Sequence, residues 1–577
     1  MIKLYKRLSL VTVILAVAFM SVQVVSDLYL PTLTSNIIND GVATGDINYI
    51  WRTGFIMIGF SIISIIAAIG NTYFATRESQ KLGKKLRSDV YQKVENSSLN
   101  TFDKFGTASL ITRTTNDINQ IAMVIQMSLR MMINAPITLI AASFLAYQKD
   151  SALTKVFFYV IPILVVVIGV LMYFAVPLFK SMQEKTDRLN LVFRENLTGV
   201  RVIRAFNKTK YEENRFDDAN EDYTQTSIKV NTLMSLMMPL MTLIMSGTNI
   251  AITWFGAHYI ADMQLEVGNL IAFMTYAMQI LMSFMMLAML FVMIPRAQAS
   301  AKRINEVLDE KDEILDPVTP KKLVAQKEQA TLAFNQVNYR YTGAEKLALE
   351  GIDFKVKSGQ TVAIIGGTGS GKTTLVHLIP RLYDIEAGEI SINGQNIVEV
   401  TQQNLRELIG FVPQKAVLFS GTIRENMQYG NAKATDEEIW QALTTAQARD
   451  FVESLEDGLD SWVEQGGGNF SGGQKQRLAI ARALVKPADI FVFDDSFSAL
   501  DFKTDAKLRQ ALKTDVTNSI LVIVAQRVST VMDADMILVL DEGKVIGKGT
   551  HQELLATSQT YQEIVASQLR EEDLVNE

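Results

Sequence analysis

A glycine-rich run near the middle of the chain has the residue types and spacing that bind phosphate. It follows an apolar stretch, 361–365, and precedes a helix-compatible stretch, 374–379. The glycines allow backbone N–H groups to turn inward and surround phosphate oxygens at a helix N-terminus. The run fits the pattern G-x-x-x-x-G-K-[ST], so Lys372 is expected to reach the β- and γ-phosphates and Thr373 to ligate Mg²⁺. Its members are Gly366, Gly367, Thr368, Gly369, Ser370, Gly371, Lys372, Thr373 and Thr374. The pattern predicts a nucleoside triphosphate site.

Other segments of the second half carry side chains suited to the same chemistry. Tyr341 lies upstream of the glycine-rich run, where an aromatic ring could stack on a base. The apolar run 490–493 reads as a strand that ends in two carboxylates, Asp494 and Asp495. Each segment alone is weak evidence. The remaining candidates are Gln414, the predicted helix start Ser471, Gly472, Gly473 and Gln474, and then Asp501 and Gln526.

The composition limits what else the chain can do. Its 577 residues are too many for one hydrophobic core, so at least two domains are expected. The chain has no cysteine, which excludes disulfides, thiol catalysis and cysteine-ligated metal sites. The net charge of −6 argues against a general nucleic-acid binder. Only three histidines are present: His258, His377 and His551.

The first half contains apolar stretches long enough to cross a bilayer. Such a span needs about 20 mostly apolar residues. The basic N-terminus leads into a run that is too long for a cleavable signal and has no small-residue cleavage site, so it is interpreted as the first span. The six predicted spans are 9–38, 52–75, 121–147, 153–178, 231–260 and 267–295.

Basic residues are distributed unevenly between these spans. Residues 76–120 and 178–229 carry eight and ten Lys or Arg, whereas residues 39–51 and 256–267 carry none. The positive-inside rule therefore places the N-terminus, both long loops and the second half of the chain in the cytoplasm. Both loops mix charges with periodic apolar residues and are interpreted as helical extensions of the spans, either solvated hairpins or levers that touch the second half. Breaks suited to short transverse helices are expected at 105–110 and near 196–199.

Three side chains within the spans are candidates for substrate contact. Asp27 lies in the first span, where a carboxylate is costly; it either pairs with another helix or binds a cationic substrate. Met278 and Met282 belong to a set of thirteen methionines within 231–295. Methionine adapts its shape and suits a promiscuous binding surface, although ordinary helix–helix and helix–lipid packing is the stronger single explanation of these residues.

The chain is therefore expected to have two domains of different class. Residues 1–310 form an all-α transmembrane domain of six spans with two long cytoplasmic loops. Residues 311–330 are polar, contain Pro317 and Pro320, and are interpreted as a linker. From 331 to 577, short apolar β-rich runs alternate with helical segments, as in an α/β P-loop ATPase domain.

The order and spacing of these motifs resemble the ABC exporter half-transporters over nearly the whole chain. The resemblance implies a type IV exporter-like membrane domain fused to one nucleotide-binding domain that uses ATP and Mg²⁺. It implies that Tyr341 stacks on the base and that the run from Gly366 to Thr374 holds the phosphates. Thr373, Gln414 and, through water, Asp494 would serve the metal. Five further residues would contact nucleotide bound to a second subunit. They are Ser471, Gly472, Gly473, Gln474 and Asp501.

Two positions depart from the family pattern. The family has Glu after the metal-binding Asp, to orient or activate water, and here the residue is Asp495. The family has a switch histidine where this chain has Gln526, and none of the three histidines replaces it in the sequence. A carboxylate one methylene shorter loses on the order of 1 Å of reach, and such a misplacement can cost about 100-fold in rate. The amide of Gln526 cannot become a cation as imidazole can.

Together, the two departures resemble the degenerate-site subunit of heterodimeric bacterial multidrug exporters. This predicts a partner half-transporter that carries the consensus Glu and His. One site would use this chain's phosphate loop, Asp495 and Gln526, and would hydrolyse ATP slowly. The other would use the partner's phosphate loop, closed by Ser471 to Gln474 of this chain. Asp495 could still act as a weaker base. The resemblance also implies a catalytic role for Gln414, which would sense Mg²⁺ and the attacking water.

The leading expectation is an exporter of amphipathic, often cationic, drugs or other hydrophobic compounds across a bacterial cell membrane. A lipid or peptide exporter is an alternative of the same class. An ATP-gated regulator or channel is an alternative of another class, and steady ATP turnover would count against it. An importer is disfavoured because spans and ATPase are fused with no substrate-binding domain, and a homodimer is a further possibility.

Overall fold

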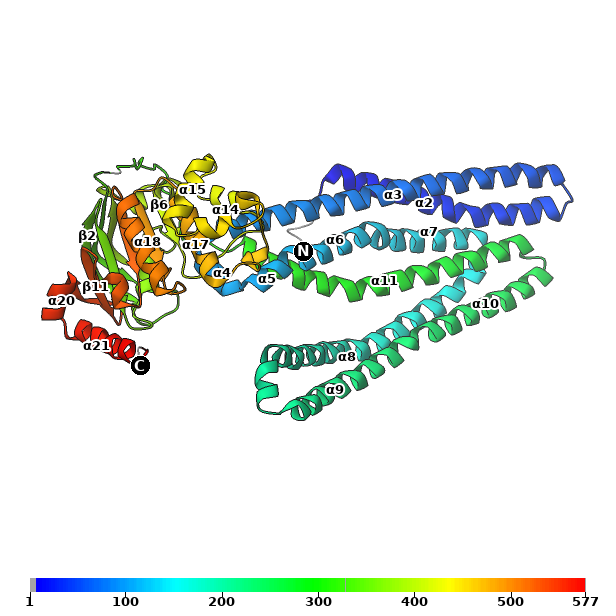
Figure 1. The fold of residues 1–577 in the computed structure, drawn as a ribbon. Coiled ribbons are helices and arrows are strands. Elements are labelled where there is room, and N and C mark those ends of the chain that lie inside the picture. Colours follow the sequence, from blue (N-terminus) through cyan, green and yellow to red (C-terminus); the bar gives the residue numbers. More distant parts are fainter. Residues whose placement is uncertain (1–6, 327, 576–577) are drawn as a thin grey trace. The chain divides into compact units, whose positions relative to one another are not determined.

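The computed structural model describes residues 7–326 and 328–575, without the side chains of 288–292 and 569–575. The chain divides into two compact units. The first comprises the residues up to Glu95 together with Thr107–Asp309, and the second comprises Asn96–Gly106 and the residues from Glu310 onward (Figure 1).

The first unit is built from long helices. Six of its helical segments within the described residues are long and apolar enough to cross a membrane, and each contains one of the predicted spans over most of its length. Three π-helical turns interrupt the helices, at Ile37–Val42 (η1), Arg113–Asp117 (η2) and Ser128–Met132 (η3). The α-helices are α2 (Leu10–Asn36), α3 (Ile47–Glu95), α5 (Thr107–Thr112), α6 (Ile118–Met127), α7 (Ile133–Lys149), α8 (Ser151–Ala205), α9 (Thr209–Ser235), α10 (Met237–Ala261) and α11 (Val267–Leu308).

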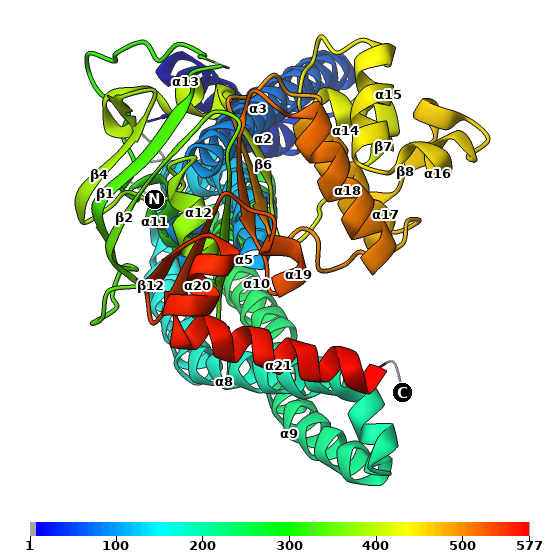
Figure 2. The same ribbon diagram turned by 60° about the vertical axis from the view of Figure 1, so that its left-hand side comes forward.

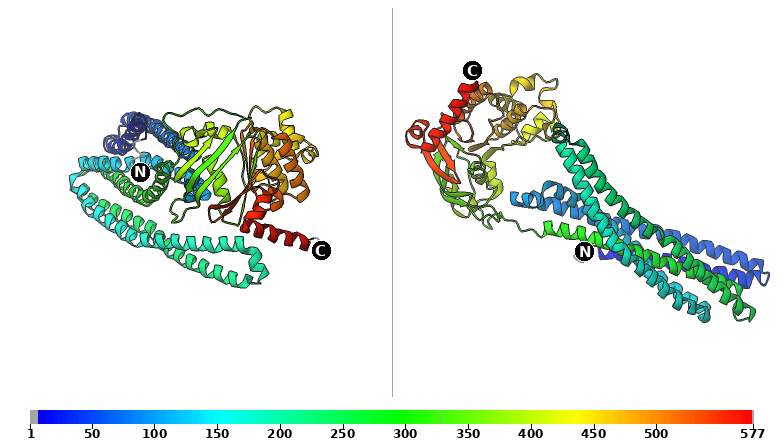
Figure 3. Two further views of the ribbon diagram at one scale, coloured as in Figure 1. Left: turned by 90° about the vertical axis from the view of Figure 1, so that its left-hand side faces the viewer. Right: turned by 90° about the horizontal axis from the view of Figure 1, so that it is seen from below.

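Helix α8 is a continuous helix of 55 residues with Pro162 and Pro177 inside it. The break expected near 196–199 is wrong, because α8 continues through these residues and ends at Ala205. The turn comes at Asn207, which has a φ of 51°, a left-handed conformation that ends helices and that Asn tolerates better than most residues. Helices α8 and α9 lie side by side in both views of Figure 3, and Asp222 of α9 pairs with Lys185 and Arg188 of α8.

A polar network joins three helix ends where the short connections of the first unit meet. The Asn39 side chain donates to Glu266 over 2.6 Å and accepts from the backbone N–H of Gly268 over 2.7 Å. The hydroxyl of Ser35 donates to Asn269 over 2.7 Å and accepts from the Lys149 ammonium over 3.2 Å. These bonds fix the ends of α2, α7 and α11 to one another.

A second network joins the C-terminal part of α11 to the turn η2, which precedes the third predicted span. Asp117 is buried, and its carboxylate accepts from Arg303 over 2.8 Å and from the Ser300 hydroxyl over 2.8 Å. A buried carboxylate requires such donors, because burial without them is costly. Arg113 also pairs with Glu306 over 3.0 Å. These contacts fix the C-terminal part of α11 to the turn η2.

The described residues of the second unit form three β-sheets. In the six-stranded sheet the strand order is β12-β11-β3-β10-β9-β6, parallel except for β12. A four-stranded antiparallel sheet has the order β2-β1-β4-β5, and β7 pairs with β8. The strands are β1 (Thr331–Tyr339), β2 (Leu349–Lys357), β3 (Thr361–Gly366), β4 (Ala387–Ile392), β5 (Gln395–Asn396), β6 (Ile409–Val412), β7 (Gly421–Thr422), β8 (Trp462–Val463), β9 (Ile490–Asp494), β10 (Ile520–Val524), β11 (Met536–Asp541) and β12 (Lys544–Gly549).

Figure 2 shows the antiparallel strands β1, β2 and β4 on one side of the second unit and α15, α17 and α18 on the other. The central strands β9 and β10 are buried along their whole length, as their unbroken apolar sequence requires for a parallel sheet covered on both faces. The helices are α4 (Leu99–Phe105), α12 (Lys372–Leu378), α13 (Gln402–Glu407), α14 (Ile423–Gln428), α15 (Asp436–Thr445), α16 (Arg449–Glu453), α17 (Gly472–Leu484), α18 (Phe502–Asp515), α19 (Val528–Val531), α20 (His551–Thr557) and α21 (Gln559–Val575), with 3₁₀ turns η4 (Ile397–Glu399), η5 (Gly458–Asp460) and η6 (Gln465–Gly467).

The short helix α4 groups with the second unit although it lies within the first long loop of the sequence. Gly106, with a φ of 72°, ends α4 at the predicted break. The Asn100 amide donates to Glu313 over 2.7 Å and to Thr342 over 3.2 Å, and Lys104 pairs with Glu310 over 2.7 Å. The predicted boundary at residue 310, with both loops in the first domain, therefore does not assign α4 to the second unit. The residues that hold α4 in the second unit are distant from it in the sequence.

Candidate functional site

The glycine-rich run connects β3 to α12, as its flanking sequences predict. Gly371 has a φ of 100°, and a Cβ there would lie 3.0 Å from the carbonyl oxygen of Ala348. The position therefore favours glycine on both conformational and steric grounds. The Lys372 ammonium donates to the carbonyl oxygens of Gly366 and Gly367 over 2.9 and 2.7 Å. The lysine is thus held inside the loop that it would share with phosphate.

Asp494 ends β9 beside this loop. The Thr373 hydroxyl donates to Asp494 Oδ1 over 3.0 Å, and Asp494 Oδ2 is buried without a hydrogen-bond partner. Burial, opposed by the Thr373 hydrogen bond and reinforced by the neighbouring charge of Asp495, raises the pKa of Asp494 to about 6. A buried carboxylate oxygen that lacks a donor is suited to a cation or to its bound water.

His377 is a neighbour of Asp494 that the sequence did not indicate. Its Nε2 lies 3.6 Å from Asp494 Oδ2, and burial lowers the pKa of His377 and keeps the ring neutral. Thr373 and His377 are four residues apart on α12, so both face the same carboxylate. The i, i+4 spacing from the phosphate-loop threonine is the signal that could have identified it.

The two departing positions meet in the structure. Asp495 Oδ2 accepts hydrogen bonds from Gln526 Nε2 over 2.7 Å and from Gln414 Nε2 over 3.3 Å. The backbone of Asp495 has a φ of 48°, a left-handed conformation that Asp tolerates better than most residues. Three residues predicted from separate motifs therefore form one cluster, in which two amides hold the shortened carboxylate.

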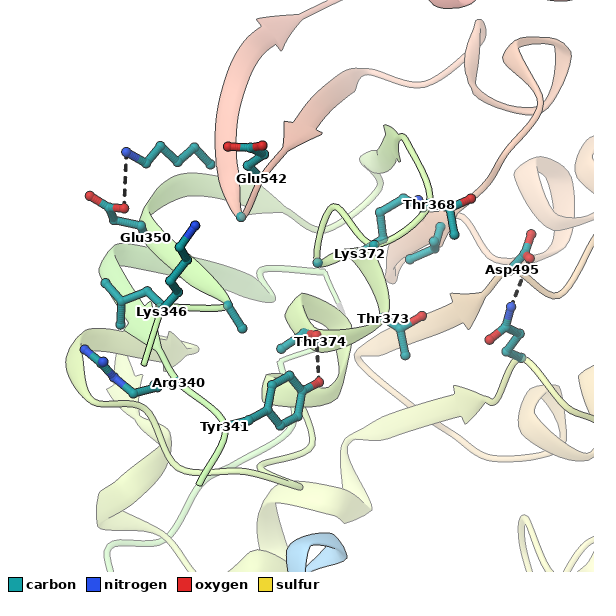
Figure 4. Close-up of a pocket in the computed structure, with 18 of the residues that line it drawn as sticks. Arg340, Tyr341, Lys346, Glu350, Thr368, Lys372, Thr373, Thr374, Asp495 and Glu542 are labelled. Atoms are coloured by element: carbon teal, nitrogen blue, oxygen red, sulfur yellow. Dashed lines mark hydrogen bonds and ion pairs between the residues drawn. The ribbon is translucent and has the colours of Figure 1, made fainter. Parts of the chain in front are cut away.

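A cavity of about 990 Å³ lies over the phosphate loop (Figure 4). Tyr341 lines it, and its hydroxyl lies 2.8 Å from the Thr374 hydroxyl, so that the ring is fixed beside the loop. Gln414, Asp495 and Gln526 line the same cavity. The basic side chains Arg340, Lys346 and Lys544 also line it, and no motif had indicated them.

The residues present fit a nucleoside triphosphate with its metal. The cavity offers an aromatic ring, basic side chains and the N-terminus of α12. Besides Asp494 Oδ2, the Ser370 hydroxyl is buried without a partner, so the loop has polar capacity that the protein does not use. Thr373, Gln414 and Asp494 are the residues that would hold Mg²⁺.

The predicted trans-acting residues lie elsewhere in the second unit. Ser471 caps α17: its hydroxyl accepts from the N–H of Gln474, and the Gln474 side chain accepts from the N–H of Ser471. Asp501 caps α18, and its hydrogen bonds to Thr504 lower its pKa. None of Ser471, Gly472, Gly473, Gln474 and Asp501 lines the cavity. The predicted trans-acting residues thus lie apart from the cavity over the phosphate loop.

Of the predicted substrate residues, Asp27 lies on α2, and Met278 and Met282 lie on α11. The Asp27 carboxylate accepts a hydrogen bond from the Ser64 hydroxyl of α3, which is the structural alternative for this residue. Met278 and Met282 of α11 are 48 % and 42 % exposed. Their role in substrate contact remains a prediction.

The raised pKa of Asp494 gives a prediction for the nucleotide-free protein. Because the folded-state pKa of about 6 exceeds the unfolded value near 3.9, the stability associated with this group is present at low pH and is lost as pH rises through 6. Asp494→Asn removes the buried charge, so the apparent melting temperature at pH 7.5 in EDTA should rise by about 2–6 °C. The difference should disappear by about pH 4.

The control for this measurement is Asp505→Asn. Asp505 is also buried, but it is paired with Arg509 over 3.3 Å, so the same change should lower the melting temperature at pH 7.5. A decrease for both variants would show that the Asp494 charge is stabilised in the empty site.

The fold and the site define a membrane-embedded nucleoside triphosphatase: six spans joined to a P-loop domain. The profile of the ABC transporter transmembrane region matches residues 13–284, and the profile described as ABC transporter matches residues 349–498. An uncharacterised ABC transporter ATP-binding protein of Mycobacterium tuberculosis is 39 % identical over 570 residues, which is 98 % of this chain and 97 % of the relative. The chain belongs to the ABC transporter family.

Two further likenesses cover most of the chain. A multidrug resistance ABC transporter ATP-binding and permease protein of Lactococcus lactis is 30 % identical over 89 % of this chain and 85 % of the relative. The solved structure of a bacterial Atm1-family ABC exporter with ATP bound aligns with a TM-score of 0.79 at 26 % identity, over 97 % of both chains. The predicted fold class is confirmed: a type IV exporter membrane domain with six spans and an ABC ATPase domain. The chain is a multi-pass membrane protein of the exporter type.

Proposed function

We propose that this chain is the degenerate-site half of a heterodimeric drug exporter. The observation that carries the proposal is the cluster at Asp495, whose Oδ2 accepts from both Gln526 and Gln414. A carboxylate that activates water needs a free oxygen directed at that water. In this chain two amide donors hold Oδ2 and so fix the orientation of the carboxylate, and the side chain is one methylene shorter than the family's Glu.

Gln526 adds a second reason for slow hydrolysis. Its amide binds the carboxylate over 2.7 Å, whereas the family's histidine at this position can carry positive charge. An amide can donate to a phosphate oxygen but cannot neutralise charge that develops on it. This site is therefore suited to retain ATP, not to turn it over rapidly.

The binding functions of the site are intact. Lys372 and the backbone N–H groups at the start of α12 bind phosphate oxygens, Thr373 and Asp494 hold the metal, and Tyr341 contacts the base. Mg²⁺, when bound, offsets the charge of the phosphates and supports the leaving group. Retained ATP keeps the two ATPase domains associated and biases the conformational equilibrium of the membrane halves.

The catalytic contribution of this chain goes to the partner's site. Ser471 to Gln474 begin a 13-residue helix whose N-terminus is free of the chain's own cavity, which suits capture of phosphate bound to another subunit. The partner carries the consensus Glu and His at the positions of Asp495 and Gln526. Hydrolysis occurs in that second site.

The substrates are amphipathic drugs or other hydrophobic compounds. Support comes from the name of the Lactococcus lactis relative, a multidrug resistance transporter, and from the methionine-rich last spans. The N-terminus and the ATPase domain lie in the cytoplasm of a bacterial cell, with the spans in its plasma membrane. The basic loops support this orientation through the positive-inside rule.

The proposal is tested with the full-length chain purified alone and with the chain co-expressed with the product of the neighbouring gene. Alone, the chain should bind a photoreactive ATP analogue, but its ATP turnover should be at most about 1 % of that of the complex, because the shortened carboxylate costs about 100-fold. Lys372→Ala is the matched control and should abolish the labelling. Turnover by the chain alone at the rate of the complex would contradict the proposal and indicate a functional homodimer.

A further inference from the structure

A cavity of about 420 Å³ lies inside the membrane-spanning unit, among α2, α3, the α6–η3–α7 segment and α11. Its wall combines apolar and polar side chains. Asn71, Gln126 and Asn134 are among its amide residues, and Arg130 is its one charged residue. Its methionines are Met20, Met123, Met127, Met131 and Met286.

Three of the amide side chains of this cavity, those of Asn71, Gln126 and Asn134, already donate within the protein. Asn71 donates to the carbonyl oxygen of Ala16 over 2.8 Å, and Gln126 donates to the Thr76 hydroxyl over 2.9 Å. Arg130 differs: among the residues that the structure describes, no carboxylate forms an ion pair with its guanidinium. Arg130 is exposed in the single chain, so its guanidinium is available to a ligand in the cavity, and ionisable residues of membrane-spanning segments often mark substrate pathways.

The position of Arg130 along its helix adds a second constraint. It lies in the π-helical turn η3, a local insertion that often occurs at functional sites. At about 1.5 Å per residue, Arg130 lies about 29 Å from Lys149, where the helix ends. Met286 lies about as far from the start of α11 at Val267. Since a hydrocarbon core is about 30 Å thick, the cavity adjoins the membrane boundary opposite the short connections.

An occupant must therefore satisfy three conditions. It must provide an anion for Arg130, because no carboxylate lines the cavity. It must present apolar surface to the methionines, which adapt to varied shapes. Its charged end must lie at the membrane boundary and its apolar end in the hydrocarbon.

We infer that this cavity binds an amphipathic anion, with the headgroup paired to Arg130 and the apolar portion against the methionines. The inference rests on the proposed export function, and it assigns to the substrate a charge opposite to the one that Asp27 had suggested. The planar guanidinium suits carboxylate, sulfate and phosphate headgroups alike. Two sources share this chemistry: an anionic lipid of the inner leaflet and an anionic amphiphile that is exported.

The test measures binding of dansyl-labelled undecanoate to the full-length chain in phosphatidylcholine discs without ATP. Arg130→Gln should weaken this binding about 10-fold or more, since it removes a charged hydrogen-bond partner. Arg130→Lys should keep most of the affinity because it keeps the charge. The trimethylammonium analogue of the probe should be unaffected by either change.

Arg77→Gln is the matched control. Arg77 is exposed on α3, contacts Tyr73, and does not line the cavity. Unchanged undecanoate binding in Arg130→Gln, or an equal loss for both probes, would overturn the inference. Discs that contain phosphatidylglycerol distinguish the sources: competition with the probe identifies a lipid, and its absence identifies an exported amphiphile.

A transport measurement separates this inference from the proposed function. If undecanoate binds through Arg130 but ATP does not drive its export by the complex, the site stands and drug export through it fails. If the complex exports other compounds while Arg130→Gln leaves anion binding unchanged, the proposed function stands and the inference fails.

Discussion

Replacing Gly472 by Glu in this chain is expected to lower ATP turnover by the assembled transporter at least about 100-fold, as loss of a preorganised anion site does in other enzymes. Gly472 is the first residue of α17, and a Cβ at this position meets no atom within 4 Å. The new carboxylate fits the chain itself. It repels the phosphate that the helix N-terminus is proposed to receive from the partner's site.

Gly472→Glu is expected to lower ATP turnover without lowering thermal stability, so a loss of turnover would not reflect misfolding. An acidic residue in the first turn of a helix is stabilising, by about 0.3–1 kcal/mol. The melting temperature should therefore not fall although turnover is lost. Gly472→Gln introduces a side chain of the same shape as Glu but without its charge. It therefore separates the effect of charge repulsion from the effect of side-chain size.

Lys372→Ala supplies the comparison within the same chain. This change removes ATP from the site that we propose to be slow. ATP turnover by the assembled transporter should then fall by less than about 10-fold, because only the coupling between the two sites is lost. If Lys372→Ala abolishes turnover while Gly472→Glu spares it, hydrolysis occurs on this chain's own phosphate loop and the assignment of the two sites is reversed.

The second large effect is a gain of activity. In the Gly472→Glu background the partner's site is inactive, so residual turnover reports this chain's own site. Adding Asp495→Glu and Gln526→His should raise that residual turnover about 100-fold, because the longer carboxylate regains about 1 Å of reach. The histidine at the same time removes the 2.7 Å amide bond that holds the carboxylate.

The single changes should be weaker than the pair. With Asp495→Glu alone, Gln526 and Gln414 can still bind the carboxylate. The left-handed backbone at this residue also disfavours Glu by about 1 kcal/mol, so a small loss of thermal stability is expected. Lys372→Ala should cancel the gain. If the double change alters neither ATP occupancy nor turnover, Asp495 and Gln526 are not what makes this site slow.

The motif-bearing parts of the second unit could be predicted because local sequence determines them. The strand over 361–365, the glycine loop and the helix after Lys372 all lie where the sequence places them. The buried strand ending at Asp494 was equally clear, because the unbroken apolar run 490–493 suits a sheet covered on both faces.

The contacts that give the site its character could not be predicted. Gln414, Asp495 and Gln526 come from three motifs, and only the parallel order of β6, β9 and β10 brings them together. His377 lies on α12, and only its i, i+4 spacing from Thr373 indicates that it faces Asp494. Sequence patterns indicate the periodicity of an element but not its neighbours, and so Arg130 passed as an ordinary residue of the third span.

Helix boundaries show the same limit in the first unit. Gly199 suggested a break near 196–199, yet a single glycine costs a helix only about 1 kcal/mol and is tolerated when neighbouring contacts persist. Across this region Phe193 packs near Phe216, and Glu195 pairs with Arg215 of α9 over 2.6 Å. These contacts between α8 and α9 favour continuation of the helix.

The continuity of α8 has a mechanical consequence. Its two prolines each remove a backbone hydrogen bond and are the natural points of bending, and the helix contains no proline beyond Pro177. From Pro177 to Ala205 the helix is a rigid arm of about 42 Å. A bend of about 10° at Pro177 would move the end of that arm by about 7 Å, more than one helical turn. A small rearrangement among the spans thus becomes a large displacement at Ala205, without any hinge in the polar loop.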